Sequence, residues 1–155
     1  MLKNKLAIIG GSGLYNIEGL SNIESLKIKT PWGDPSDEPT KALFKSKEVI
    51  FLPRHGRGHF ISPTKINYRA NIDALKQLGV TDIVSISAVG SLKEDLEPGM
   101  FVIVDQFIDR TFARNKTFFD EDIVAHVSMA KPTSEGLMNA CEESIKSENI
   151  QYKRG

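Results

Sequence analysis

Two arginines and two histidines lie within six consecutive residues in the first half of the chain, a composition that favours anion binding. Residues 54–59 read Arg-His-Gly-Arg-Gly-His and directly follow a short apolar run that predicts a β-strand. Arg54 could grip a phosphate with two parallel, charge-assisted hydrogen bonds. The glycines would hold the loop close to its neighbours. The alternative interpretation is a basic loop that is only solvated.

The spacing of His55 and His59 would also permit a zinc site. The metalloprotease motif, however, requires glutamate directly after its first histidine, and Gly56 occupies that position. We therefore expect no metal site in this loop.

A glycine-rich turn near the N-terminus offers donors to the same kind of ligand. Residues 10–13 read Gly-Gly-Ser-Gly after an apolar run, so the backbone could turn sharply and point N–H groups at an anion, with Ser12 adding a hydroxyl. The turn fails three stricter templates: the dinucleotide fingerprint needs glycine at Asn16, the NTPase loop needs Gly-Lys-Ser/Thr, and the hydrolase elbow needs glycine at Leu14. It could equally be a simple connection.

A third candidate follows a largely apolar run that suits a strand buried on both faces. We predict this strand over residues 82–88, which places Ser87 at its carboxyl end, where α/β enzymes bind ligands. A core serine bonded to its own backbone is the alternative.

The elements that must position these residues alternate between strands and helices. We predict strands over residues 6–9, 23–29, 42–44, 49–52, 82–88 and 101–105, with the start of another at 150–154. Residues 46–47 should form the turn between the third and fourth strands. Helices are expected over residues 68–78, capped by Gly79, and around 137–145, with a capping box predicting one helical turn at 91–94. This order predicts an α/β fold: a mixed twisted sheet flanked by helices.

Two features outside these segments have less specific meanings. His126 lies between apolar residues, a setting more typical of a satisfied core histidine than of a ligand. Phe107, Phe112, Phe118 and Phe119 fall in a long irregular segment and indicate a core or a subunit interface.

Composition argues against several classes of partner. The 20 basic and 20 acidic residues cancel, and without a basic stripe nothing favours nucleic acid or an anionic membrane. No stretch approaches the length of a membrane span, and the N-terminal apolar run is too short for a signal-peptide core. Cys141 is the single cysteine, which fits a reducing compartment, and we expect a cytoplasmic location.

Taken together, the segments resemble the methylthioadenosine phosphorylases of purine nucleoside phosphorylase family 2. The likeness begins in residues 6–14 and continues through 54–59, Pro63 and 66–71. It then includes residues 87–92, 98–99, 105–111 and 125–130, in the family's order. The resemblance implies a phosphorylase/nucleosidase-like fold, of which residues 1–155 would be the N-terminal portion of a single phosphorylase domain.

The resemblance also implies a reaction and a site. Inorganic phosphate would attack the anomeric carbon of 5'-methylthioadenosine, releasing adenine and 5-methylthioribose 1-phosphate, in purine and methionine salvage. Phosphate is then a co-substrate and no cofactor is needed. The family's phosphate contacts correspond to Ser12, Arg54, His55, Ser87 and, through its backbone N–H, Ala88. His126 corresponds to a residue that reaches the neighbouring subunit's site in a homotrimer.

Family members continue well beyond position 155, so we expect a truncated chain that lacks the catalytic and base-recognition residues. Two alternatives stay open for this reason. The substrate could be methylthioinosine or a purine ribonucleoside, or the 155-residue chain could be a non-catalytic fragment.

Overall fold

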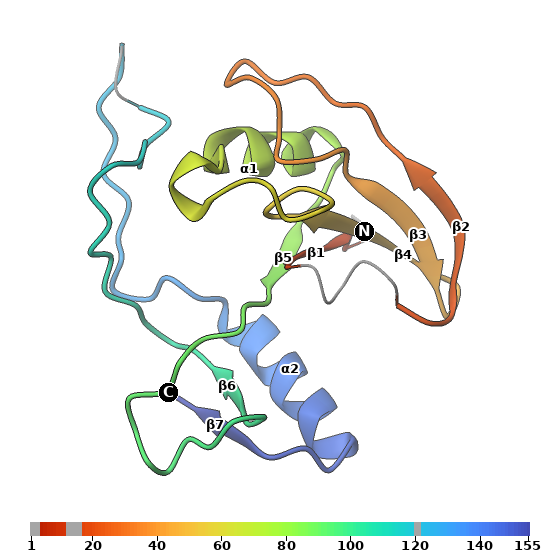
Figure 1. Ribbon diagram of the computed structural model, residues 1–155, viewed down its shortest axis with the longest axis vertical. Coiled ribbons are helices and arrows are strands. Elements are labelled where there is room, and N and C mark those ends of the chain that lie inside the picture. Colours follow the sequence, from red (N-terminus) through yellow and green to blue (C-terminus); the bar gives the residue numbers. More distant parts are fainter. Residues whose placement is uncertain (1–3, 12–16, 120–121) are drawn as a thin grey trace. The chain divides into compact units, whose positions relative to one another are not determined.

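The computed structural model describes residues 4–11, 17–119 and 122–155 (Figure 1). The chain divides into two compact units. The first comprises the residues up to Ser87 together with Ala113–Phe118, and the second comprises Ala88–Phe112 and Phe119–Gly155. The expectation that residues 1–155 belong to one domain stays a prediction.

The first unit contains a mixed five-stranded sheet, as the sequence predicts. Its strands lie in the order β2-β3-β4-β1-β5. The central strand β1 is parallel to both β4 and β5, whereas β3 pairs antiparallel with β2 and β4. The strands are β1 (Leu6–Gly10), β2 (Leu20–Ser25), β3 (Thr40–Phe44), β4 (Lys47–Pro53) and β5 (Asp82–Ser85).

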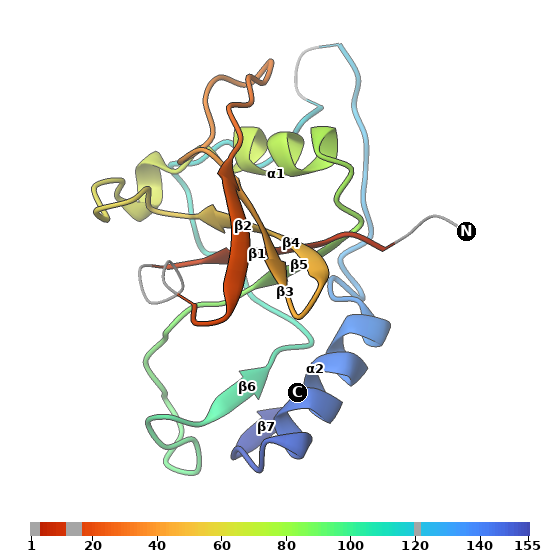
Figure 2. The same ribbon diagram turned by 90° about the vertical axis from the view of Figure 1, so that its right-hand side faces the viewer.

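Helix α1 (Tyr68–Gln77) covers one face of this sheet and follows the 3-10 turn η2 (Pro63–Lys65) (Figures 1 and 2). Asn67 caps its start by accepting a hydrogen bond from the Ala70 N–H at 3.1 Å, and Gly79 ends it at φ +75°. The helix was therefore predicted correctly. Its apolar side completes a core of side chains with at most 8% exposure: Ala7, Ile9, Ile50, Leu52 and Leu75.

The largest differences between predicted and observed strand boundaries are at β2 and β5. β2 lies at 20–25 rather than 23–29. Leu26 N–H still donates to the Pro39 carbonyl at 2.8 Å, but Pro39 has no N–H to return a bond, so the ladder ends there. β5 ends at Ser85 rather than at residue 88, and Ser85 pairs with Ile9, the residue before the last one of β1. β5 is only half-buried, because among the described residues it pairs with β1 alone.

The β3–β4 turn lies one residue earlier than predicted, at Lys45 and Ser46. Their φ angles are +46° and +66°. Positive φ at both central residues is typical of the tight hairpin turn whose twist matches the flanking strands.

A late segment of the chain, Ala113–Phe118, belongs to the first unit. The Phe118 ring packs edge-on against Trp32 at 5.2 Å between centroids, and the Thr117 carbonyl accepts a hydrogen bond from Arg69 of α1 at 3.3 Å. The Arg69 guanidinium also lies over the Trp32 ring, 4.6 Å from its centroid. Cation–π and edge-to-face contacts thus fix this segment beside the start of α1.

The second unit is built on the parallel pair β6 (Phe101–Ile103) and β7 (Tyr152–Arg154), with α2 (Glu135–Ser147) between them in sequence (Figure 2). The C-terminal strand and helix confirm the predictions, although β6 is shorter than the predicted 101–105. The helical turn predicted at 91–94 is wrong. A capping box needs the Ser91 hydroxyl to bond the N–H three residues on, but it accepts from Lys93 N–H, two residues on, at 3.1 Å.

No helix in the described part of the chain combines the length and the apolar character needed to cross a lipid bilayer.

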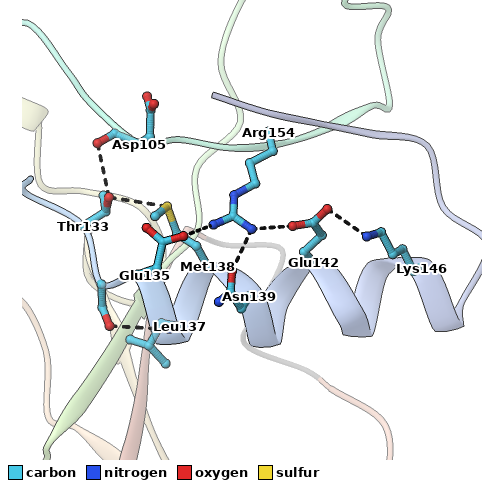
Figure 3. Close-up of polar contacts among 10 residues, drawn as sticks. Asp105, Thr133, Glu135, Leu137, Met138, Asn139, Glu142, Lys146 and Arg154 are labelled. Atoms are coloured by element: carbon cyan, nitrogen blue, oxygen red, sulfur yellow. Dashed lines mark hydrogen bonds and ion pairs between the residues drawn. The ribbon is translucent and has the colours of Figure 1, made fainter.

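Arg154 of β7 connects that strand to α2 through its guanidinium (Figure 3). It donates to Asn139 at 2.7 Å and to Glu135 at 2.7 Å, and it also pairs with Glu142. Lys146 pairs with the same Glu142 carboxylate at 2.9 Å. Hydrogen bonds from Lys146, Arg154 and Tyr152 lower the pKa of Glu142 from 4.5 to about 2.

The lowered pKa of Glu142 predicts acid sensitivity of the second unit. The ionised Glu142 stabilises the folded state, because its folded-state pKa lies below the unfolded value. This contribution is complete above pH 4.5 and is lost as the pH falls towards 2. Unfolding midpoints measured by circular dichroism between pH 5 and 2 should fall less steeply for Glu142→Gln than for the wild type. Parallel pH profiles for the two proteins would contradict this prediction.

Candidate anion-binding site

The carboxyl ends of three adjacent parallel strands meet at one edge of the sheet. The register pairs Gly10 with Pro53 and Ile9 with Ser85. One hydrogen bond extends each ladder beyond its strand: Arg54 N–H donates to the Gly10 carbonyl at 3.0 Å, and Ile86 N–H donates to the Ile9 carbonyl at 2.9 Å. The backbones that carry two of the three predicted phosphate segments are thereby fixed next to β1.

Arg54 and Ser87, which are 33 residues apart in sequence, are in direct contact. Arg54 Nη1 donates to Ser87 Oγ at 2.6 Å and to the Ile86 carbonyl at 3.3 Å. Arg54 is half-buried and Ser87 is exposed. The structure therefore brings these two predicted site residues together.

The arrangement leaves two donors for a ligand. Arg54 Nη2 makes no hydrogen bond to any residue that the structure describes, and the Ser87 hydroxyl accepts from Arg54 without donating to a described residue. A guanidinium N–H and a hydroxyl side by side form a charge-assisted site for an oxyanion.

His55 is buried at 7% exposure, and both of its ring nitrogens have partners. Nδ1 lies 2.8 Å from the Ile61 carbonyl, which can only accept, so Nδ1 carries the hydrogen. Nε2 then accepts from Arg54 Nε at 3.3 Å. The His55 ring also stacks on His59, with centroids 4.4 Å apart. His55 thus orients the Arg54 guanidinium, and its predicted direct contact to phosphate stays a prediction.

The bend after His55 depends on Gly56, which has φ +70°. A Cβ built at this position would lie 2.9 Å from the Phe60 ring and 3.1 Å from the Ser36 carbonyl oxygen. Both the backbone conformation and the close packing therefore favour glycine here.

The sequence did not reveal which residues outside loop 54–61 hold that loop in place. Asp37 accepts a hydrogen bond from the Arg57 backbone N–H at 2.6 Å, and the adjacent Ser36 pairs with Asn71 of α1. In sequence, residues 30–40 form a turn-rich excursion, and their three acidic residues are the only signal of a basic partner.

The other predicted site residues are not tested by this geometry. Ser12 lies outside the described residues. Ala88 follows Ser87, is exposed and begins the second unit.

His126 is exposed, so it is not the core histidine that its apolar neighbours suggest. Four phenylalanines are also not buried in the described chain, with exposures from 37% to 95%, so the subunit-interface alternative stays the prediction for them: Phe107, Phe112, Phe118 and Phe119.

In the described ranges 4–11, 17–119 and 122–155, no three or more His, Cys, Asp or Glu side chains lie where they could bind one metal ion together.

Comparison with known sequences identifies the family. The sequence profile of the phosphorylase superfamily matches residues 5–155, and the chain belongs to this superfamily. It is similar to S-methyl-5'-thioadenosine phosphorylase of Rhodospirillum rubrum (55% identity, 97% of this chain and 51% of the relative). The corresponding protein of Hyperthermus butylicus is 60% identical over 88% of this chain and 50% of its own length. The chain thus spans about half the length of these curated relatives.

Solved structures confirm the phosphorylase-like α/β fold. A methylthioadenosine phosphorylase from an antarctic soil metagenomic library superposes with a TM-score of 0.94 at 46% identity, covering 99% of this chain and 55% of that one. Methylthioadenosine phosphorylase from Schistosoma mansoni in complex with adenine gives 0.88 at 39% identity, covering 96% and 55%.

Replacing Gly56 with alanine tests the shape of the loop. Gly56→Ala adds a steric clash to an unfavourable backbone conformation, so we expect it to lower the free energy of unfolding by about 3 kcal/mol. Gly79→Ala is the matched control, because Gly79 has a similar φ of +75° but no atom within 4 Å of the added Cβ. It should lose only about 1 kcal/mol in urea unfolding. Equal losses would show that crowding at Gly56 is unimportant.

Proposed function

We propose that the protein carrying this sequence catalyses the phosphorolysis of 5'-methylthioadenosine, giving adenine and 5-methylthioribose 1-phosphate. The observation that carries the proposal is the convergence of Arg54 and Ser87 at the ends of parallel strands, with donors left for an oxyanion. The names of the relatives supply the substrate: proteins 55% and 60% identical to this chain are S-methyl-5'-thioadenosine phosphorylases.

The chemistry explains why such a site is needed. An oxygen of phosphate forms a bond to the anomeric carbon while the bond from that carbon to the purine nitrogen breaks, and the bonding pair leaves with the base. The nucleophile is already anionic, so the enzyme must mainly hold it still and aim it. Arg54 would bind one face of the dianion, and the Ser87 hydroxyl would donate beside it.

The remaining roles in this proposal come from the family pattern. Ser12 and the Ala88 N–H would complete the phosphate site, with His55 beside Arg54. His126, which is exposed, would reach the nucleoside site of a neighbouring subunit in a homotrimer. The reaction would need no cofactor, and the enzyme would work in the cytoplasm.

An assay of base release tests the proposal directly. A protein that continues this sequence to the length of its relatives should release adenine from methylthioadenosine only when phosphate is present. Methylthioinosine and adenosine should be tested in parallel, because preference for either would change the assigned substrate but not the reaction. Adenine release without phosphate would overturn phosphorolysis. The 155-residue chain alone should show little or no turnover.

Arg54→Ala should impair the use of phosphate. Loss of a hydrogen bond to a charged group costs about 1.5–3 kcal/mol, so kcat/KM for phosphate should fall about 10- to 150-fold. Arg54→Lys is the matched control, since it keeps the charge but not the two-pronged geometry, and it should recover only part of the loss. An unchanged dependence of rate on phosphate concentration would reject this role.

A further inference from the structure

We propose that Asp37 is a positioning residue for phosphate, which acts by holding loop 54–61 in the shape that presents Arg54. This inference rests on the proposed function, because it assigns Arg54 to the phosphate co-substrate. Neither the glycine-rich turn nor the basic motif contains Asp37, which lies in the turn-rich excursion between β2 and β3.

The Asp37 carboxylate makes two contacts to the loop. One oxygen accepts from the Arg57 backbone N–H at 2.6 Å and lies 3.7 Å from Arg57 Nε. The Asp37 side chain is 18% exposed, whereas that of Arg57 is 55% exposed. The ion pair to the exposed Arg57 guanidinium should contribute little, so we assign the positioning to the backbone bond, which fixes the chain three residues after Arg54.

Asp37 is itself held in place by a buried polar link to α1. The adjacent Ser36 donates its N–H to Asn71 Oδ1 at 2.7 Å, and Asn71 Nδ2 donates to Ser36 Oγ at 3.0 Å. Ser36 and Asn71 are 7% and 3% exposed. A buried, satisfied pair of this kind gives a rigid attachment, so α1 supports Asp37 and Asp37 supports the loop.

Further hydrogen bonds of the loop connect the position of Arg57 to that of the anion-binding groups. The Arg57 guanidinium donates to Thr40 at 2.7 Å, and the Ile61 N–H donates to the His55 carbonyl at 3.1 Å. The bond between Ile61 and His55 closes the loop next to His55, whose Nε2 accepts from Arg54. Displacing Arg57 would therefore move the residues that aim the Arg54 guanidinium.

Electrostatics and positioning predict opposite effects of removing this carboxylate. Asp37 is an anion beside a loop that is proposed to bind a dianion, so the field of its charge alone weakens phosphate binding. If only charge mattered, Asp37→Ala and Asp37→Asn would both tighten phosphate binding. If the backbone bond matters, Asp37→Ala weakens binding, while Asp37→Asn retains an oxygen that can accept from the Arg57 N–H.

The experiment compares these variants in a protein that continues this sequence to the length of its relatives. For Asp37→Ala we expect KM for phosphate and the calorimetric Kd for inorganic phosphate to rise about 10-fold. KM for the nucleoside and kcat at saturating phosphate should stay within about 3-fold. Asp37→Asn should stay within about 3-fold of the wild type in every constant. Asp34→Ala is the control, because Asp34 is exposed on the same segment and makes no hydrogen bond or ion pair with a described residue.

Several results would overturn the inference. These are an unchanged or lower phosphate Kd in Asp37→Ala, an equal rise in both KM values, or the same effect in Asp34→Ala. If Asp37→Ala does not fold, amide exchange in the wild type decides: the Arg57 N–H should exchange at least 10-fold more slowly than in an unstructured peptide, and an unprotected amide rejects the bond. Phosphate binding without turnover would reject the proposed reaction but not the role of Asp37.

Discussion

The register of three parallel strands is the constraint on which the candidate site depends. Because β4 and β5 both pair with β1, the residues after each strand leave the sheet at one edge. The hydrogen bonds from Arg54 N–H to Gly10 and from Ile86 N–H to Ile9 carry this order one residue beyond each strand. A core of small and branched side chains beneath α1 keeps the strands in place. The site is therefore located by backbone pairing before any polar side chain contributes.

On that framework, polar contacts refine the direction of one cation. The Arg54 guanidinium is oriented by the His55 ring, the Ser87 hydroxyl and the Ile86 carbonyl. These are neutral groups, so its charge is not cancelled by a neighbouring carboxylate in the described chain. An arginine held in this way is preorganised, and an incoming anion would not need to displace a salt-bridge partner.

The sequence predicts the element types well because local signals and burial agree in the regular parts. Asn67 and Gly79 mark both ends of α1, and the apolar residues 6–9 form the centre of the sheet. Strand ends were less predictable, because they depend on the neighbouring strand. Pro39, just before β3, limits β2, and the short strand β1 is the partner of β5. The Arg54–Ser87 pairing follows from an α/β topology, whereas the Asp37–Arg57 bond joins a loop to a loop and has no periodic signal. His126 and the phenylalanines illustrate a further limit, because apolar neighbours in sequence do not ensure burial.

The return of Ala113–Phe118 to the first unit has a topological consequence. The chain passes between the two units at three places, after Ser87, Phe112 and Phe118, so no single cut separates them. The contacts of Phe118 with Trp32 and of Thr117 with Arg69 close a long loop that begins and ends in the first unit. Residues 88–112 are therefore tethered at both ends to the first unit, and loop closure restricts the conformations that they can adopt when unfolded.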